Sequence, residues 1–386
     1  MPLDFGFTDE QLAFKQSVKE FAQKVVAPGS DQRDRDGRFD RDVWNAVGEF
    51  GLCGLPIPEE YGGSGADIVT TNLAFEALEE GGRDSGLLLS LGAHVCIGAA
   101  PIWLHGTDEQ KRAYLPKLCS GEWIGAFAIT EPDAGSDAAG IKTTARRDGD
   151  GWILNGSKTF ITNGPVADVI SVVAVTDPDA ASGSRMSCFI VEPPTEGFEV
   201  GKELDKMGNR SSPTSELYFR DCYVPHASML GPEGSALWKV AFECFDWERT
   251  VMVASAIGGM EAQLAGCVEY AKERKAFGKS ISQFEMIQDK LARMRVNINA
   301  SRWLLYHAAW LKQEGKPHMQ EASIAKYFVA EAAVQNALEA VQIFGGYGYI
   351  KEFPVERSIR DAKLATIGGG TSEIQKLIIA RTLLGE

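Results

Sequence analysis

Residues 151–164 read GWILNGSKTFITNG, and this stretch decides the fold class. Its β-branched and aromatic residues flank Asn155-Gly156, which is a strong short-range signal for a β-hairpin. We therefore predict two short strands joined by a tight turn at Asn155-Gly156. Three later stretches, 168–176, 186–192 and 215–225, have the same texture between turn residues. Together they predict a small antiparallel β-barrel or sandwich.

Helical patterns flank this β region on both sides. From residue 8 to about 120, apolar residues recur at three- and four-residue steps, and Thr8 with Gln11 forms a possible capping box. After the β region, the predicted helices cover about 235–275, 287–314 and 319–344, and a last one follows Thr371. We predict an α+β protein with an N-terminal all-α domain (1–122), a middle antiparallel β-barrel domain (123–232) and a C-terminal four-helix bundle (233–386).

The composition argues against several classes of partner. A net charge of −14 disfavours nucleic acid or an anionic membrane surface. Seven scattered cysteines without a CxxC pair favour buried thiols in a reducing compartment, so we expect a cytoplasmic protein. The apolar stretch 87–104 contains His94 and Pro101, which favours buried helices over a membrane span. The acidic start of the chain does not resemble a secretory signal.

Common catalytic motifs are missing from the sequence. It has no GxxxxGK[ST], no GxGxxG between a strand and a helix, and no HExxH or Cys/His cluster, so no metal is expected. Two turns, 129–137 (ITEPDAGSD) and 367–376 (IGGGTSEIQK), could instead present backbone amides to a polar ligand. Phe160 and Thr162 are predicted on one strand face, where an aromatic ring beside a hydroxyl suits an aromatic heterocycle. Each feature alone is more often an ordinary turn or core strand.

One acidic residue stands on an apolar helical face. Residues 241, 245, 248, 252 and 255 share that face and are Ala, Phe, Glu, Met and Ser. Burial of an unpaired carboxylate raises its pKa, which suits a base that works near neutral pH. The alternative, which the residues alone favour, is a glutamate at the helix edge or one paired with Arg249.

Six segments taken together resemble the acyl-CoA dehydrogenase family along nearly the whole chain. They are ITEPDAGSD (129–137), KTFITNGPVADV (158–169), KMGNRSSPTSELYFRDCYVP (206–225), ERKAFGKSISQF (273–284), QIFGGYGY (342–349) and GGGTSEIQKLIIAR (368–381). The resemblance implies bound FAD, removal of the α-proton of an acyl thioester by a carboxylate, and transfer of the β-hydrogen as hydride to flavin N5. It also implies an acyl-CoA substrate, an electron-transferring flavoprotein as acceptor, and a homotetramer built as a dimer of dimers.

Motif by motif, the resemblance assigns site residues. In the middle domain, the implied FAD contacts are Phe127, Ile129, Thr130, Gly135, Ser136, Phe160, Ile161 and Thr162. A second subunit would add Arg274, Phe277, Gln342, Gly345 and Gly346, and the start of the last helix would add Thr371 and Glu373. The implied substrate contacts are Ser136, Asp246, Arg249, Gly369 and Gly370. Glu285 replaces a family glutamine that touches the cofactor, so it is left out of the FAD set.

The usual base of the family has no counterpart at its usual place. Many members carry it just before the final Gly-Thr-Ser, where this chain has Gly369. The sequence is closest in pattern to the isovaleryl-CoA dehydrogenase-like branch, which has Gly or Ala in that turn and a Glu before an Arg in the bundle helix. This resemblance predicts Glu248 as the catalytic base.

Other readings of the resemblance concern the substrate and the electron acceptor. Residues 83–94 and 247–249 also resemble a biosynthetic branch that oxidises acyl or aminoacyl groups tethered to a carrier protein, so a carrier-protein thioester is the alternative substrate. A non-catalytic binding protein is disfavoured by the presence of Glu248 beside intact flavin motifs. The sequence also leaves open that the protein is an oxidase or a flavin monooxygenase, which would use oxygen.

Overall fold

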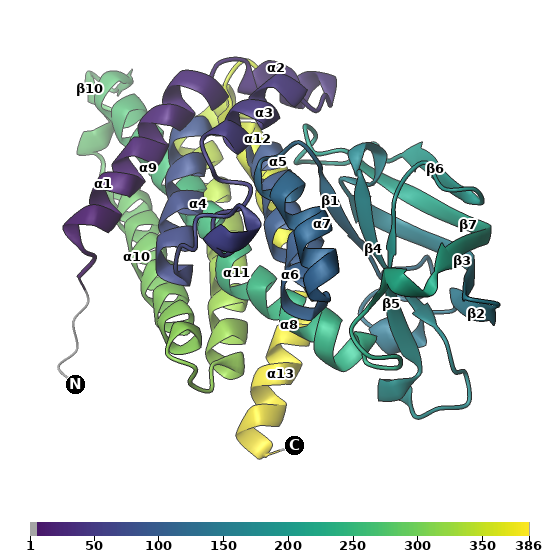
Figure 1. The fold of residues 1–386 in the computed structure, drawn as a ribbon. Helices are drawn as coiled ribbons and strands as arrows, with labels where there is room; N and C mark the ends of the chain where they lie inside the picture. The colour runs from purple at the N-terminus through teal and green to yellow at the C-terminus, as the bar shows by residue number, and fades with distance from the viewer. Residues whose placement is uncertain (1–5, 386) are drawn as a thin grey trace.

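A computed structural model describes residues 6–385, which form two helical regions and a β-sheet between them in sequence (Figure 1). The helices before the sheet are α1 (Asp9–Phe21), α2 (Ser30–Asp36), α3 (Arg41–Glu49), α4 (Ile68–Gly82), α5 (Ser85–Ala93), α6 (Ala100–His105) and α7 (Asp108–Cys119). Thr8 and Gln11 form the predicted capping box of α1. The π-helical turns Ala22–Val26 and His94–Ala99 follow α1 and α5.

The apolar stretch 87–104 is a buried helix, as predicted. By length and composition alone, Ser85–His105 and Ala236–Glu273 could each cross a membrane, but 78% of the most apolar window in Ser85–His105 is buried inside the protein. Within it, His94 Nε2 lies 3.0 Å from the Leu118 carbonyl oxygen, and the Gly125 amide donates to His94 Nδ1 at 3.0 Å. Burial lowers the pKa of His94 to about 4. A neutral histidine therefore connects the N-terminal helices to the first strand.

The sheet contains β1 (Gly125–Ala128), β2 (Thr144–Asp148), β3 (Gly151–Thr162), β4 (Val169–Val175), β5 (Met186–Val191), β6 (Phe198–Glu203), β7 (Thr214–Pro225) and β8 (Met229–Leu230). Its order is β6-β7-β3-β2-β4-β5-β8, with β1 added on β4. Most neighbours are antiparallel, as predicted, whereas β1 with β4 and one residue pair of β2 with β4 are parallel. One core cluster fills the space enclosed by the sheet, and another lies between the sheet and the neighbouring helices.

The hairpin predicted at Asn155-Gly156 is wrong. β3 is one strand that runs through both residues, and its pairing with β7 shifts register between Leu154 and Gly156, which marks a β-bulge. The side-chain amide of Asn155 donates to Asp221 Oδ1 of β7 at 3.0 Å, and its oxygen accepts the Asp221 backbone N–H at 2.9 Å. These two hydrogen bonds hold the bulge. The hairpin turn lies earlier, at 149–150, because β2 and β3 pair up to Asp148 opposite Gly151.

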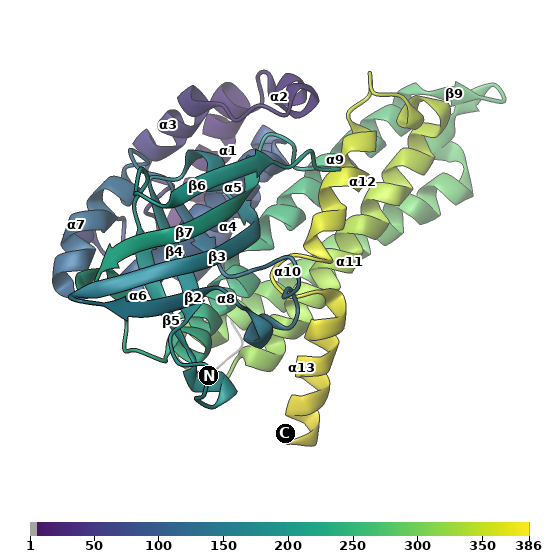
Figure 2. The ribbon, with the colours of Figure 1, turned by 90° about the vertical axis from the view of Figure 1, so that its right-hand side faces the viewer.

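The C-terminal region begins with one long, interrupted helix. It consists of a π-helical turn Ala236–Ala241, α8 (Phe242–Trp247), a second π-helical turn Glu248–Met252 and α9 (Ala254–Glu273). The remaining elements are β9 (Lys275–Ala276), β10 (Lys279–Ser280), α10 (Glu285–Gln313), α11 (Met319–Phe344), α12 (Val355–Ala365) and α13 (Ser372–Leu384). The predictions did not include α12. Figure 2 shows β9 at the end of the bundle far from the sheet, and α13 extending beyond the bundle.

Candidate active site

Phe160 stands out on the strand that carries the predicted flavin contacts. Its side chain is 68% exposed, and its φ of 59° lies in the left-handed region, where few non-glycine residues are found. The β3–β7 pairing shifts register between Lys158 and Ile161, so a second irregularity turns the ring outward. Such strain persists only where the surroundings impose it, and it marks functional sites.

A buried ion pair holds the backbone beside Phe160. Lys158 is fully buried, and its ammonium donates to Glu131 Oε1 at 2.7 Å and to the Ile129 carbonyl at 3.1 Å. Glu131 also accepts the backbone amides of Lys142 and Thr143, at 2.7 and 2.9 Å. The pKa of Glu131 is lowered, because Lys158 and these donors outweigh the effect of burial. The ITEPDAGSD turn is thus fixed to β3.

The other predicted contacts of the middle domain differ in exposure. Phe127, Ile129 and Ile161 are buried in core clusters. Gly135 and Ser136 are exposed, and a Cβ at Gly135 would have no neighbour within 4 Å. Thr130 and Thr162 are half-buried. An exposed ring, a hydroxyl side chain and an open glycine turn therefore belong to one connected region of β1 and β3.

The second predicted group lies elsewhere in the chain. Arg274, Phe277, Gly345 and Gly346 line a groove of about 610 Å³ at the ends of α9 and α11, and Gln342 is exposed beside them. Phe277 is 95% exposed and, like Phe160, has a positive φ, of 50°. α9 is 20 residues long, so this groove lies about 30 Å along the helix from the sheet end of α9 (Figure 2). The structure does not bring the two groups together within one chain.

The glycine turn meets the glutamate that was predicted to replace the base. A Cβ atom at Gly369 would lie 3.0 Å from the carboxyl carbon of Glu248 and 3.1 and 3.2 Å from its two oxygens. Gly369 itself has φ +64°. The carboxyl group of Glu248 therefore occupies the space that a side chain at position 369 would need. Glu248 begins the π-helical turn Glu248–Met252, an irregularity that is frequent at functional sites.

Burial and charge act in opposite directions on Glu248. Its side chain is half-buried, and enclosure by the protein raises its pKa, while Arg249 and then Lys326 oppose that rise. Arg249 is 7% exposed, and its Nε has no hydrogen-bond partner among residues 6–385. Its guanidinium carbon lies 6.0 Å from the centre of the Phe245 ring. The cluster of Glu248, Arg249 and Lys326, named here the base cluster, thus contains a buried donor free to bind a ligand.

Side chains of α11 and α13 donate hydrogen bonds to the Gly369–Gly370 turn beside Glu248. Gln375 of α13 donates to the carbonyls of Gly369 and Gly370 at 3.1 and 3.0 Å, and Lys326 of α11 donates to the Gly370 carbonyl at 2.6 Å. Thr371 caps α13 by accepting the Ile374 amide at 3.3 Å. Glu373 is exposed in the first turn of α13, where negative charge is favoured.

Asp246, predicted as a substrate contact, forms ion pairs away from the base cluster. Its carboxylate lies 2.5 Å from Lys312 Nζ and 2.8 Å from His318 Nε2. Hydrogen bonding to Asp246 raises the pKa of His318. Asp246 therefore links α8 to the end of α10 and to His318, the residue just before α11. Glu285, the departure from the family pattern, is exposed in the first turn of α10, where the helix dipole favours a carboxylate.

All three parts of the chain match models of one family. The acyl-CoA dehydrogenase N-terminal, middle and C-terminal domain models match residues 8–122, 126–222 and 238–384. The chain belongs to the acyl-CoA dehydrogenase family. This family membership makes the protein an FAD-dependent oxidoreductase, and it confirms the resemblance predicted from the six segments.

Similar proteins cover the whole length of the chain. An acyl-CoA dehydrogenase of Bacillus subtilis is 44% identical over 98% of this chain and 99% of its own. A mitochondrial isovaleryl-CoA dehydrogenase of Oryza sativa is 42% identical over 98% of this chain and 92% of its own. The structure of butyryl-CoA dehydrogenase from Megasphaera elsdenii is 43% identical with a TM-score of 0.95, and the match covers 99% of this chain and 100% of that one.

A structure from a different branch is also similar. The prolyl acyl carrier protein oxidase AnaB is 39% identical with a TM-score of 0.95, and the match covers 98% of this chain and 100% of that one. The fold is therefore shared by proteins named for CoA thioesters and by one named for a carrier protein.

Two residues of the site were not found from the sequence. Lys326 and Gln375 both contact the glycine turn, but each lies within an ordinary helical pattern. A lysine among the alanines of 322–333 is a usable signal, because α11 buries most of that stretch. Gln375 carries no such signal, since glutamine four residues into a helix is unremarkable.

Proposed function

We propose that this protein oxidises the α,β-bond of an acyl-CoA and that Glu248 removes the α-proton. The contact of the Glu248 carboxyl group with Gly369 supports this assignment most strongly. It puts a carboxylate at the turn where many family members carry their base, although the residue comes from another helix. The prediction of a relocated base therefore has geometric support.

The residues on β1 and β3 fit the isoalloxazine of FAD. The outward Phe160 ring offers a face for stacking, and the half-buried Thr162, two residues further along β3, supplies a hydroxyl. In the turn after β1, a Cβ atom at Gly135 would have no neighbour within 4 Å, and Ser136 is exposed. When bound there, FAD would supply the acceptor for the β-hydrogen.

The distant groove fits the other half of FAD from a second copy of the chain. Arg274 has a fork of donors suited to a pyrophosphate, and Cβ atoms at Gly345 and Gly346 would have no neighbour within 4 Å. One FAD cannot reach both regions of one chain if they are about 30 Å apart along α9. We therefore propose a dimer in which each site uses two subunits, and dimers that pair as a homotetramer.

The base cluster can perform the proton transfer with residues of the chain alone. Burial keeps the pKa of Glu248 raised, so its carboxylate is a stronger base than an exposed glutamate. Arg249, with its unpartnered Nε, can bind a polar group of the substrate beside Gly370, as predicted for both residues. Side chains at 369 and 370 would block this approach, so the glycines allow the thioester to lie next to the base.

Replacement of the base tests this proposal. Glu248→Gln should keep the fold and bound FAD and lower kcat by roughly 10²–10⁴-fold, the usual contribution of a general base. Glu243→Gln is a matched control, because Glu243 lies on the same helix with a 54% exposed side chain, and it should change kcat less than about two-fold. Full turnover by E248Q would remove Glu248 from the mechanism.

A carrier-protein thioester is the second candidate substrate, because AnaB has the same fold over nearly the whole chain. We favour acyl-CoA, since the relatives at 42–44% identity are named for CoA thioesters. Turnover of one acyl group on CoA and on a carrier protein decides between them. We expect at least ten-fold higher kcat/KM with CoA; the reverse order would support the carrier-protein function.

The electron acceptor and location follow from the same proposal. We propose an electron-transferring flavoprotein as acceptor and a cytoplasmic location, consistent with seven buried free cysteines. Anaerobic turnover with an artificial acceptor should match the aerobic rate. Turnover that requires oxygen would instead indicate an oxidase or monooxygenase.

A further inference from the structure

Lys326 is a buried lysine that has no part in the proton transfer described above. Lys326 is 3% exposed on α11, and Lys326 and Glu339 are the two charged side chains that this helix buries among its described residues. Glu339 pairs with Lys290 at 2.5 Å. Lys326 instead donates to a backbone carbonyl, that of Gly370, at 2.6 Å. A buried ammonium directed at a backbone turn is costly unless nearby negative charge compensates it.

The groups that face Lys326 and Glu248 come from several elements. Burial, the largest influence, lowers the pKa of Lys326 to about 8, and Arg249 lowers it as well. Glu248 opposes this shift, and Glu331 of α11 and Glu373 of α13 oppose it more weakly. Arg249 is the first and Lys326 the second cation that acts on Glu248. Cys96 also faces Glu248, and burial raises the pKa of this thiol, so it is neutral. Asp246 acts on Arg249 but is itself held by Lys312 and His318.

We propose that Lys326 is a positioning residue that fixes the Gly369–Gly370 turn against Glu248 and supplies a charge that keeps the Glu248 carboxylate ionised. Its two roles use different properties of one side chain. The hydrogen bond to the Gly370 carbonyl holds the turn beside the base, where a Cβ atom added at Gly369 would lie 3.1 and 3.2 Å from the two carboxylate oxygens of Glu248. The positive charge offsets the burial that disfavours the ionised base.

The proposal rests on the proposed function, in which Glu248 is the base. It extends that function, because it explains how a base enclosed by protein stays unprotonated at neutral pH. Arg249 alone is placed to bind substrate through its free Nε, so its charge would be engaged during turnover. Lys326 is engaged by the turn and is available to Glu248 throughout.

Three substitutions separate the charge from the hydrogen bond. Lys326→Met removes both, Lys326→Gln keeps a donor for the Gly370 carbonyl, and Lys326→Arg keeps a positive charge. In the FAD-loaded enzyme, we expect K326M and K326Q to move the acidic limb of the kcat–pH profile upward by about one unit, while K326R stays near wild type. Activity of K326M should therefore recover at higher pH. Lys290→Met, which removes another lysine partly buried between α10 and α11, should leave the limb unchanged.

A spectroscopic measurement checks the same point without turnover. Difference infrared spectroscopy can follow the C=O stretch of protonated Glu248, assigned by its loss in E248Q. The midpoint of this band should rise in K326M and K326Q, as the kinetic limb does. If K326M does not fold, K326Q and K326R still give opposite results.

The failures are distinguishable. An active E248Q would refute the proposed function, and the infrared midpoint would still report whether Lys326 acts on Glu248. An inactive E248Q, together with an unchanged limb and an unchanged infrared midpoint in K326Q and K326M, would overturn the proposal for Lys326 alone. Loss of activity at all pH values without a shift would show a purely structural lysine and would equally overturn it.

Discussion

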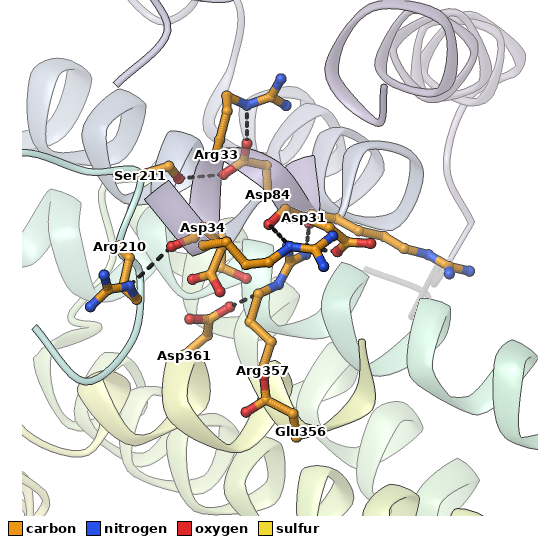
Figure 3. A network of polar contacts seen from close by, with 12 residues as sticks. Asp31, Arg33, Asp34, Asp84, Arg210, Ser211, Glu356, Arg357 and Asp361 are labelled. Carbon is orange, nitrogen blue, oxygen red and sulfur yellow. Dashed lines mark hydrogen bonds and ion pairs between the residues drawn. The ribbon is translucent and has the colours of Figure 1, made fainter. Parts of the chain in front are cut away.

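Two clusters of buried charge in this protein differ in how well their members are paired. One joins α2, the loop before β7 and α12, and is named here the inter-domain network (Figure 3). Arg33 Nε lies 2.7 Å from Asp84 Oδ2, Ser211 donates to Asp84 Oδ1 at 2.6 Å, and Arg360 NH2 lies 2.8 Å from Asp34 Oδ2. Its acidic and basic groups come from three parts of the chain and bind one another.

The base cluster lacks such pairing. Glu248 contacts a glycine turn, and Arg249 has a buried Nε without a partner in the described part of the chain. A paired network stabilises a domain arrangement, whereas buried groups without partners keep capacity for a ligand. The two clusters therefore differ in pairing: the inter-domain network is bonded within itself, and the base cluster has a buried donor left for a ligand.

The largest expected effect is a loss of stability in the inter-domain network. Asp84→Ala leaves Arg33, which is 4% exposed, without its carboxylate and removes the cap of α5, so the free energy of unfolding should fall by about 3–5 kcal/mol. Denaturant unfolding measures this effect. Asp108→Ala, which breaks an exposed pair with Arg112, should cost under about 1 kcal/mol. A large loss of kcat in folded D84A would contradict a purely structural role for the inter-domain network.

Asp361 is the exception within the network, and it predicts a pH dependence. Burial raises the pKa of Asp361 to about 6, above the 3.8 of an unfolded chain, although Arg357 opposes the rise. Stability from the protonated group is present below about pH 4 and is lost as pH rises through 6. Asp361→Asn should therefore become relatively more stable across this window, by up to about 3 kcal/mol. A pH-independent difference between D361N and wild type would contradict this account.

A smaller effect is expected where the glycine turn meets the base. Gly369→Ala places a Cβ 3.0 Å from the Glu248 carboxyl carbon and keeps a positive φ, so the carboxylate must move by a few tenths of an ångström. We expect kcat to fall about ten-fold with bound FAD retained. Gly368→Ala is the matched control, because its Cβ would meet only Leu364 at 3.7 Å or more, and its kcat should stay within about two-fold. Equal effects at both positions would argue against contact with Glu248.

The smallest effect concerns strain at Phe160. Phe160→Gly removes the positive-φ strain, so the apoprotein should be unchanged or up to about 1 kcal/mol more stable, while FAD affinity falls about ten-fold because the stacking ring is lost. Thermal unfolding of the apoprotein and FAD titration measure the two quantities. Arg83→Gly, at another position with positive φ, should relieve strain without weakening FAD. Lower stability of F160G together with unchanged FAD affinity would contradict both points.

The sequence predicted the three regions but not every local feature, and Glu248 as the relocated base stays a prediction. The lone carboxylate on an apolar face drew attention to Glu248, but only the family resemblance favoured it as the base, because the residues alone favoured a glutamate at the helix edge or paired with Arg249. The structure puts its carboxyl group against the Gly369 turn. Asn155-Gly156 was misread because a β-bulge and a hairpin turn use the same residues, and only the pairing with β7 separates them. Lys326 was missed because its meaning depends on a turn 44 residues later in the sequence.

Exchange of the substrate α-proton with solvent tests the central claim most directly. The wild-type enzyme with bound FAD, incubated in D₂O with an acyl-CoA that it binds but cannot oxidise, should incorporate deuterium at the α-carbon. Glu248→Gln should slow this exchange by at least about 10²-fold while FAD stays bound. Exchange at the wild-type rate in E248Q would show that another group removes the proton.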